Sequence, residues 1–352
     1  ILMSATAAVA VSAVLAFAIT GGLGFVIIPW LHKLKFGQTI LNIGPAWHKK
    51  KQGTPNMGGL MFIIGIIIAF AVSAALFAGL GGNLETDYSA IFVGRENALI
   101  ISSVMLGIGC GLVGFTDDYI KIKMKRNEGL TPSQKTLGQL VMIIGYVATL
   151  WISKNTVWYF PFIGSVDFSK NFFTGIIFWA LSVVIVYGCV NSANLTDGID
   201  GLCLSVTAVI AVSFIAMSYI LSFAGLGILA AALLGGMCGF LCWNHNPAKV
   251  FMGDTGSLFI GGVVAGLGFV IKCPILLLPI CIVFVCETMS DIIQIGYFKI
   301  THGKRIFKMA PIHHHFEMCG WKEKKICRVF SLVNAIGCLA ALLIVGFGNA
   351  VK

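Results

Sequence analysis

The sequence predicts an all-α polytopic membrane protein with about ten transmembrane helices. Of its 352 residues, 58% are hydrophobic and only 11% are charged, whereas charged residues make up about 25% of an ordinary soluble domain. Apolar runs bounded by glycine, proline and charged clusters recur along the whole chain, and a helical span needs about 20 such residues. This composition excludes a soluble enzyme, a disordered tail and a disulfide scaffold.

Ten apolar segments are the candidate spans, and we expect them to form one membrane domain over residues 1–352. They cover residues 4–30, 57–80, 98–116, 136–153, 172–191, 201–223, 226–243, 257–272, 274–300 and 329–350. The first segment lacks a basic flank, so we expect a span and not a cleaved signal peptide. Because the sequence opens on Ile1 and not on Met, we expect the natural chain to begin earlier. The run 154–170 places aromatics around a proline and a glycine and predicts a small hairpin.

The cations are unequally divided between the two sides that these spans define. Nineteen of the 24 lysines and arginines fall in or beside the loops that follow the first, third, seventh and ninth segments. The positive-inside rule makes this face cytoplasmic, and ten spans then place both termini outside the cytoplasm. The net charge of +10 therefore reflects membrane sidedness, and we expect no nucleic-acid partner. All 7 histidines also lie on the cytoplasmic face, which the rule does not explain.

Two adjacent carboxylates, Asp117 and Asp118, follow the third apolar segment. Negative charge at a helix C-terminus opposes the helix dipole, and neighbouring carboxylates repel each other. A bound cation would relieve both costs. The alternative is a solvated helix end at which Lys121 and Lys125 pair with the acids, if the helix continues. The pair alone leaves both interpretations open.

Three further cytoplasmic segments are rich in polar side chains. Residues 191–201 contain asparagine, aspartate and glycine without a cation, which fits either a helix cap or a ligand pocket. In residues 244–257, Asp254 stands in a glycine-flanked turn before the eighth segment, as a helix cap or as a ligand group. Phe251 is either a core residue or a platform for a flat base. The three consecutive histidines of residues 309–317 fit phosphate binding better than a metal site, because they cannot all point one way.

The ninth segment carries Glu287, Asp291 and Gln294 on one helical face. Acids inside a span indicate function by default, although near the interface they could simply pack against the basic loops. Together with the basic rim and the isolated aromatic, the cytoplasmic carboxylates predict an anionic, phosphate-bearing substrate. The chemistry would use a divalent cation at the membrane surface.

These motifs resemble the phospho-N-acetylmuramoyl-pentapeptide transferase family, within the polyprenyl-phosphate hexose-1-phosphate transferase superfamily. The matching segments are GTPNMGG at 53–59, the aspartate pair at 117–118, NSANLTDGIDG at 191–201, VFMGD at 250–254 and MAPIHHH at 309–315. The NLTDGIDG segment is typical of the superfamily, and APIHHH is typical of the muramoyl-pentapeptide branch. One position departs from the pattern, since Asn56 stands where the family usually has threonine.

The resemblance implies transfer of phospho-N-acetylmuramoyl-pentapeptide from UDP-MurNAc-pentapeptide to undecaprenyl phosphate. The products would be lipid I and UMP, in the first membrane step of peptidoglycan synthesis. It also implies Mg²⁺, ten helices in the lipid bilayer of the bacterial cytoplasmic membrane, a cytoplasmic active site, and a bent ninth helix beside a lipid groove. A homodimer and inhibition by nucleoside antibiotics are expected as well.

Two alternative functions compete with this reaction. A sister enzyme that loads N-acetylglucosamine-1-phosphate onto the polyprenyl phosphate is disfavoured by the triple histidine. A secondary transporter would use the acids of the ninth segment as its coupling-ion site. It is disfavoured because the sequence shows no repeat symmetry and its polar motifs gather in cytoplasmic loops.

The resemblance also carries functional residues onto matching positions of this chain. Asp254 matches the Mg²⁺ ligand, Asp117 matches the residue proposed to engage or deprotonate the lipid phosphate, and Asp118 lies beside it. Phe251 would stack on uracil. His314 matches a ligand-contacting histidine, and we expect it to be catalytic together with the three aspartates. The other expected substrate contacts are Lys51, Lys121, Lys125, Lys135, Asn191, Asn194, Asp197, Asp200, Asn244, Gly253, Ser257, Gln294, Ala310, His313 and His315.

Overall fold

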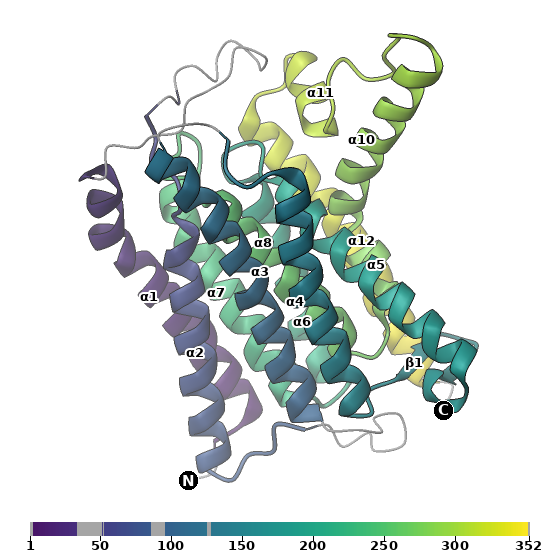
Figure 1. The fold of residues 1–352 in the computed structure, drawn as a ribbon. Coiled ribbons are helices and arrows are strands. Elements are labelled where there is room, and N and C mark those ends of the chain that lie inside the picture. Colours follow the sequence, from purple (N-terminus) through teal and green to yellow (C-terminus); the bar gives the residue numbers. More distant parts are fainter. Residues whose placement is uncertain (1–2, 34–50, 52, 86–95, 125–127, 351–352) are drawn as a thin grey trace.

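Long apolar helices that run side by side make up most of the structure (Figure 1). This computed structural model describes residues 3–33, 51, 53–85, 96–124 and 128–350. Within those ranges, nine helices are long and apolar enough to cross a membrane. They are α1 (Ala5–Lys33), α2 (Gly59–Gly79), α3 (Glu96–Met124), α4 (Pro132–Ile152), α5 (Phe172–Thr196), α6 (Leu202–Ile220), α7 (Ala224–Asn244), α8 (Gly253–Val270) and α12 (Glu323–Ala350).

The tenth candidate span is broken. It consists of η3 (Pro274–Leu276), α9 (Leu277–Ile280) and α10 (Ile282–Ile300), and the two parts meet at an angle of 84°. A proline inside α9 explains part of the break, because Pro279 has no N–H to donate to the preceding turn. The bend expected from the family resemblance is confirmed, whereas a continuous helix over residues 274–300 is wrong.

A side chain from α12 satisfies the backbone groups that this break exposes. The Asn334 amide donates to the Ile280 carbonyl at 3.0 Å and accepts from the Val283 N–H at 3.3 Å. Asn334 is fully buried, where unpaired backbone groups are costly. The bend is therefore fixed by a hydrogen-bonded contact with the last helix of the chain.

Three helices extend further toward the polar segments than the sequence predicts. The helix α3 ends at Met124 and not at residue 116, α5 ends at Thr196 and not at 191, and α8 begins at Gly253 and not at 257. Hydropathy alone stops a span where polar residues begin, but here those residues find partners across helices. The acids and amides expected in loops therefore lie on rigid helical turns.

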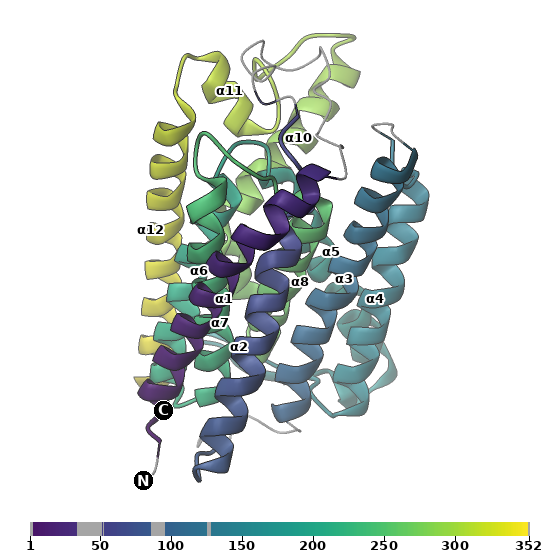
Figure 2. The same cartoon turned by 90° about the vertical axis from the view of Figure 1, so that its left-hand side faces the viewer.

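The most buried helix is α8, which lies in the middle of the bundle in both views (Figures 1 and 2). Its neighbour α3 approaches closely because glycine lines the contact. A Cβ atom on Gly114 would lie 2.1 Å from the Asp254 carbonyl oxygen. This close approach brings the polar end of α3 beside the first turn of α8.

The bundle has two distinct ends. Helix α1 begins and α12 ends at the same end, where the hairpin of β1 (Val157–Phe160) and β2 (Gly164–Asp167) also lies (Figure 1). The two strands pair antiparallel, which confirms the predicted hairpin, and the short η2 (Phe168–Lys170) follows it. The C-terminal end of α3, the first turn of α8 and the short helix α11 (Ile312–Met318) lie at the opposite end.

Candidate active site

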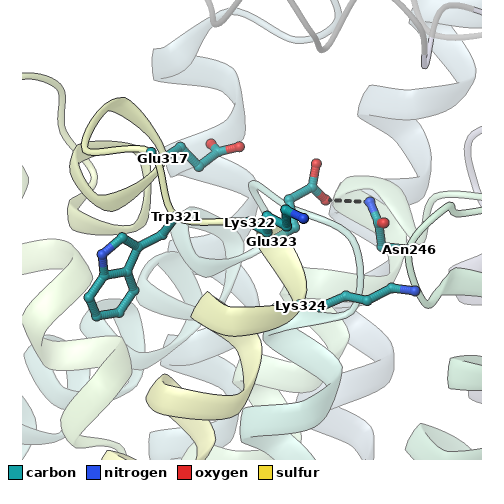
Figure 3. A pocket seen from close by; sticks show the side chains of 7 residues that line it. Asn246, Glu317, Trp321, Lys322, Glu323 and Lys324 are labelled. Atoms are coloured by element: carbon teal, nitrogen blue, oxygen red, sulfur yellow. Dashed lines mark hydrogen bonds between the residues drawn. The ribbon is translucent and has the colours of Figure 1, made fainter.

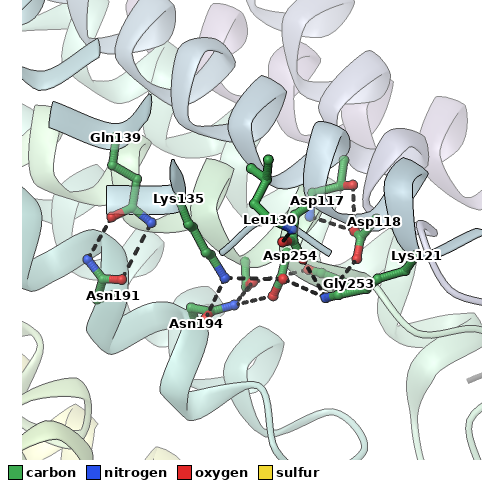
Figure 4. A network of polar contacts seen from close by, with 12 residues as sticks. Asp117, Asp118, Lys121, Leu130, Lys135, Gln139, Asn191, Asn194, Gly253 and Asp254 are labelled. Atoms are coloured by element: carbon green, nitrogen blue, oxygen red, sulfur yellow. Dashed lines mark hydrogen bonds and ion pairs between the residues drawn. The ribbon is translucent and has the colours of Figure 1, made fainter. Parts of the chain in front are cut away.

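Three carboxylates from two helices meet at the polar end of the bundle (Figure 4). Asp117 and Asp118 come from α3 and Asp254 comes from the first turn of α8, and each offers an oxygen within 4.8 Å of the others. Gly253 makes the junction possible, since its φ is 71° and a Cβ there would lie 2.5 Å from oxygens of Asn56 and Asp118. Only glycine fits this backbone conformation and this space.

Two lysines neutralise part of this charge. The Lys121 ammonium lies 2.5 Å from Asp117, 2.9 Å from Asp254 and 3.8 Å from Asp118. The Lys135 ammonium lies 3.1 Å from Asp254. The structure therefore shows the pairing of Lys121 with the acids on a continuing helix, which is one of the two interpretations that the sequence leaves open. Lys125, the other predicted partner, lies outside the described residues. Three carboxylates against two ammoniums leave the cluster with one net negative charge.

The three carboxylates differ in their hydrogen-bond partners and in how far their side chains are exposed. Asp118 is 1% exposed, accepts from the Thr255 N–H and hydroxyl at 2.9 and 2.7 Å, and accepts from the Asn56 amide at 3.1 Å. Asp117 accepts from the Leu130 N–H at 2.7 Å. The Asp254 side chain is the most accessible of the three at 18%. Asp118 thus holds α3 to α8, whereas Asp254 keeps the largest exposed surface of the three.

The donor set fits a magnesium ion. Mg²⁺ prefers carboxylate oxygens and usually takes only one or two from the protein, with water and phosphate completing its shell. Asp254 and Asp117 offer such oxygens side by side. The Lys121 ammonium binds both carboxylates, which shows that a positive charge is stabilised at this position. The sequence had assigned only Asp254 to the metal, so the structure adds the neighbouring acids to the candidate ligands.

Further predicted contacts join this cluster from α4, α5 and α8. The Asn194 amide donates to Asp254 and to the Ser257 hydroxyl, both at 2.8 Å, and Lys135 donates to the Asn194 oxygen at 3.4 Å. Asn191 lies one turn earlier on α5 and donates to the Gln139 oxygen at 2.9 Å. Its amide therefore links α5 to α4, and its expected contact with substrate stays a prediction.

A second charged cluster forms around Lys51. Its ammonium lies 2.7 Å from Asp200 and 2.8 Å from Glu323, and the Asn246 amide donates to both acids at 3.2 and 3.1 Å. Burial lowers the pKa of Lys51, but its hydrogen bonds with the two carboxylates outweigh this and hold the pKa above its usual value. The sequence reasoning missed Glu323, because the tenth span was predicted to begin only at residue 329.

Asp197 lies between these two clusters, just after the end of α5. Burial raises its pKa well above the usual value, and the negative charges of Asp254, Asp118 and Asp200 add to this effect. A carboxyl group in such surroundings holds its proton at a higher pH than an exposed aspartate does. A cationic group bound nearby would lower this pKa again, so Asp197 is sensitive to the charge of whatever occupies the site.

The three histidines lie on α11 and contact three different partners, so they do not all point one way, and their expected contact with phosphate stays a prediction. His313 is fully buried and pairs with Glu287 of α10 at 3.0 Å. His314 pairs with Glu317 at 2.7 Å, and His315 accepts from the backbone N–H of Lys308 at 3.1 Å. Of the three, His313 acts as a buried link between α10 and α11.

Gln294 and Asn244 both hold loops in the structure. The Gln294 amide donates to the Phe307 carbonyl and accepts from the N–H of the same residue, both at 3.0 Å. Asn244 donates to the Val250 carbonyl at 2.8 Å and accepts from the Gly201 N–H at 3.0 Å. Contacts of these two side chains with substrate stay predictions.

Phe251 stands three residues before Asp254, and its ring is partly exposed. Its backbone N–H donates to the Pro55 carbonyl at 2.9 Å, and its carbonyl accepts from the Gly58 N–H at 2.8 Å. These two bonds fix the loop against the segment that precedes α2. Ala310 lies two residues before α11 and is partly buried.

Comparison with known proteins assigns the chain to a family. Residues 98–272 match the model of glycosyl transferase family 4. The phospho-N-acetylmuramoyl-pentapeptide-transferase of Carboxydothermus hydrogenoformans is 41% identical over 336 residues, which cover 94% of this chain and 95% of that protein. The transferases of that name from Desulforamulus reducens and Staphylococcus aureus are 43% and 41% identical, over 94% and 95% of this chain and 93% and 98% of their own lengths. The chain belongs to the phospho-N-acetylmuramoyl-pentapeptide-transferase family.

Membership in the transferase family confirms the resemblance inferred from the motifs and removes the support for a transporter. The region matched by the glycosyl transferase model contains the aspartate cluster with Lys121, Lys135 and Asn194. The Lys51 cluster and α11 draw residues from outside that region. The aspartate cluster therefore lies within the part of the chain that is shared with glycosyl transferase family 4.

Proposed function

We propose that this transferase moves phospho-N-acetylmuramoyl-pentapeptide from UDP to undecaprenyl phosphate, forming lipid I and releasing UMP. One observation carries the proposal. Three carboxylates and two lysines converge at the ends of α3, α4 and α8, in a chain 41% identical to a transferase of that name over 94% of its length. A reaction between a diphosphate and a phosphate requires both cations and acids at one place.

Asp254 and Asp117 would hold the magnesium ion. When bound, Mg²⁺ supplies screening of the diphosphate charge and stabilises the negative charge that develops on the leaving UMP. Lys121 pairs with both of these carboxylates and Lys135 pairs with Asp254, so their ammonium groups are placed to contact phosphate oxygens. Asp117 is placed to orient the attacking lipid phosphate or to accept its proton, and Asp118 keeps the two helix ends together.

The polar end of the bundle is proposed to face the cytoplasm of a bacterium. The helices are long and apolar enough for a multi-pass protein of the plasma membrane, and 19 of the 24 lysines and arginines belong to this face. The soluble UDP-linked donor is then available on the side where the aspartates lie. The homodimer and the binding of nucleoside antibiotics stay predictions from the family.

Release of UMP tests the proposed reaction. The purified protein in detergent should release UMP from UDP-MurNAc-pentapeptide only when both polyprenyl phosphate and Mg²⁺ are present. UDP-N-acetylglucosamine serves as the competing donor, and faster release from it would favour the sister reaction.

The variant Asp254→Asn tests the role of the aspartate cluster. It should retain the fold and lose activity by about two orders of magnitude or more, because a neutral amide is a poor ligand for Mg²⁺. Glu85→Gln serves as the control, since Glu85 is an exposed acid just beyond the far end of α2. Turnover near the wild-type rate in Asp254→Asn would remove Asp254 from the mechanism.

A further inference from the structure

A pocket of about 600 Å³ opens beside the Lys51 cluster (Figure 3). Its walls come from the end of α11, the turn that leads into α12, and the loop between α7 and α8. The lining residues are Asn246, Glu317, Gly320, Trp321, Lys322, Glu323 and Lys324. None of them is among the substrate contacts expected from the sequence. Its volume falls within the range of about 300–1,000 Å³ that is typical of small-molecule sites.

Two of the lining residues bind side chains that are expected to contact the donor. Glu323 accepts from Lys51 at 2.8 Å, and Glu317 pairs with His314 at 2.7 Å. Lys51 and His314 are far apart in the sequence, yet each pairs with an acid that lines the same pocket. A donor that touches both of these side chains therefore has the pocket as its neighbour.

The exposed charges of this pocket are positive, whereas its two acids are buried or partly buried. Glu317 forms a hydrogen bond with His314. Glu323 accepts hydrogen bonds from Lys51 and Asn246. Lys322 and Lys324 are exposed, and neither forms an ion pair with any residue that the structure describes. In Figure 3 the Lys324 side chain runs toward the loop that carries Asn246. Two ammonium groups that lack an acidic partner among the described residues thus line the pocket.

We propose that this pocket is the subsite for the peptide of the donor, with Lys322 and Lys324 pairing with peptide carboxylates. The proposal rests on the proposed function, because the peptide is what this donor carries beyond its nucleotide and sugar. The phosphates must lie at the aspartate cluster, where the reaction takes place, and the lipid tail needs an apolar surface. A peptide with a free carboxyl end and backbone amides fits a pocket that offers ammonium groups, an amide and carboxylates.

Competition by soluble ligands of increasing length tests this subsite. The inhibition constants of UDP, UDP-MurNAc and UDP-MurNAc-pentapeptide would be measured on wild type and on Lys322→Ala/Lys324→Ala. An exposed ion pair contributes about 0.2–1 kcal/mol, so loss of two pairs should weaken binding of the pentapeptide donor roughly 2- to 30-fold. The constants for UDP and UDP-MurNAc should not change. Lys299→Ala/Lys304→Ala removes the same charge from exposed positions near the end of α10 and is the matched control.

Each other outcome overturns the subsite. Equal weakening of all three ligands would mean that the lysines act on the nucleotide or its phosphates. Unchanged constants, or a matching loss in the control variant, would mean that the lysines are merely solvated or act through overall charge. Failure of the proposed function would look different, because the wild type would then form no lipid product from the pentapeptide donor. Unchanged binding of UDP by the double variant also shows that it has folded.

Discussion

Removal of Lys51 should destabilise the protein, and removal of Glu323 in the same chain should restore part of the loss. Lys51 lies between two carboxylates, 2.7 Å from Asp200 and 2.8 Å from Glu323, so the oxygens that it binds are roughly 5 Å apart. At that separation two negative charges repel by about 3 kcal/mol at an effective dielectric constant of about 20. In Lys51→Met this repulsion is uncompensated, because the side chains of Asp200 and Glu323 are only 1% and 10% exposed.

The three variants should therefore rank in an unusual order. Glu323→Gln leaves a neutral Lys51–Asp200 pair and should cost about 1 kcal/mol, as the loss of one hydrogen-bonded charge does. Lys51→Met should cost about 3–5 kcal/mol, as removal of one partner of a buried ion pair does. The double variant should be more stable than Lys51→Met, because the glutamine relieves the repulsion. Thermal unfolding in one detergent, followed by tryptophan fluorescence, gives the order of midpoints. A double variant whose midpoint lies below that of Lys51→Met would refute the electrostatic account of this cluster.

Three further predictions concern the base, the site charge and the membrane sidedness. Phe251→Ala should weaken competition by UDP roughly 5- to 150-fold, as loss of base stacking does, while Phe251→Trp keeps much of the affinity; equal weakening of polyprenyl phosphate binding would make Phe251 a packing residue. Asp197→Asn should raise the unfolding midpoint at pH 8 but not at pH 4, because a raised pKa in the folded state means that the ionised carboxylate opposes folding. If the variant and the wild type differed in midpoint by the same amount at both pH values, this account would be wrong. A cysteine at His314, in a background without reactive cysteines, should resist an impermeant thiol reagent in intact cells, whereas one at Ser165 in the hairpin should react.

The sequence predicts the spans and the polar segments well, because both depend on local composition. Long apolar runs identify the helices, and the density of asparagine and aspartate marks the segment around Asn194 and Asp197. The sequence does not show where helices end when polar residues find partners in other helices. This is why α8 begins at Gly253 and not at 257, and why Asp254 lies inside a helical turn.

Pairings between distant segments could not be predicted. Lys51 and Glu323 are 272 residues apart, and no local pattern links a lysine before α2 with an acid at the start of α12. The same holds for Asn56, which looked only like a departure from the family pattern until the structure placed its amide against Asp118. A residue at a motif position can thus be recognised from the sequence, but its partner cannot.

The bend at the start of α10 has a consequence for the order of synthesis. The backbone groups at this break bind Asn334, and the Lys51 cluster needs Glu323, so both features wait for the last helix of the chain. A ribosome has already delivered every residue of the aspartate cluster by the time α12 emerges. The residues of the aspartate cluster are therefore synthesised before the residues that fix the direction of α10, and a chain that stops short of α12 would carry these acids without Asn334.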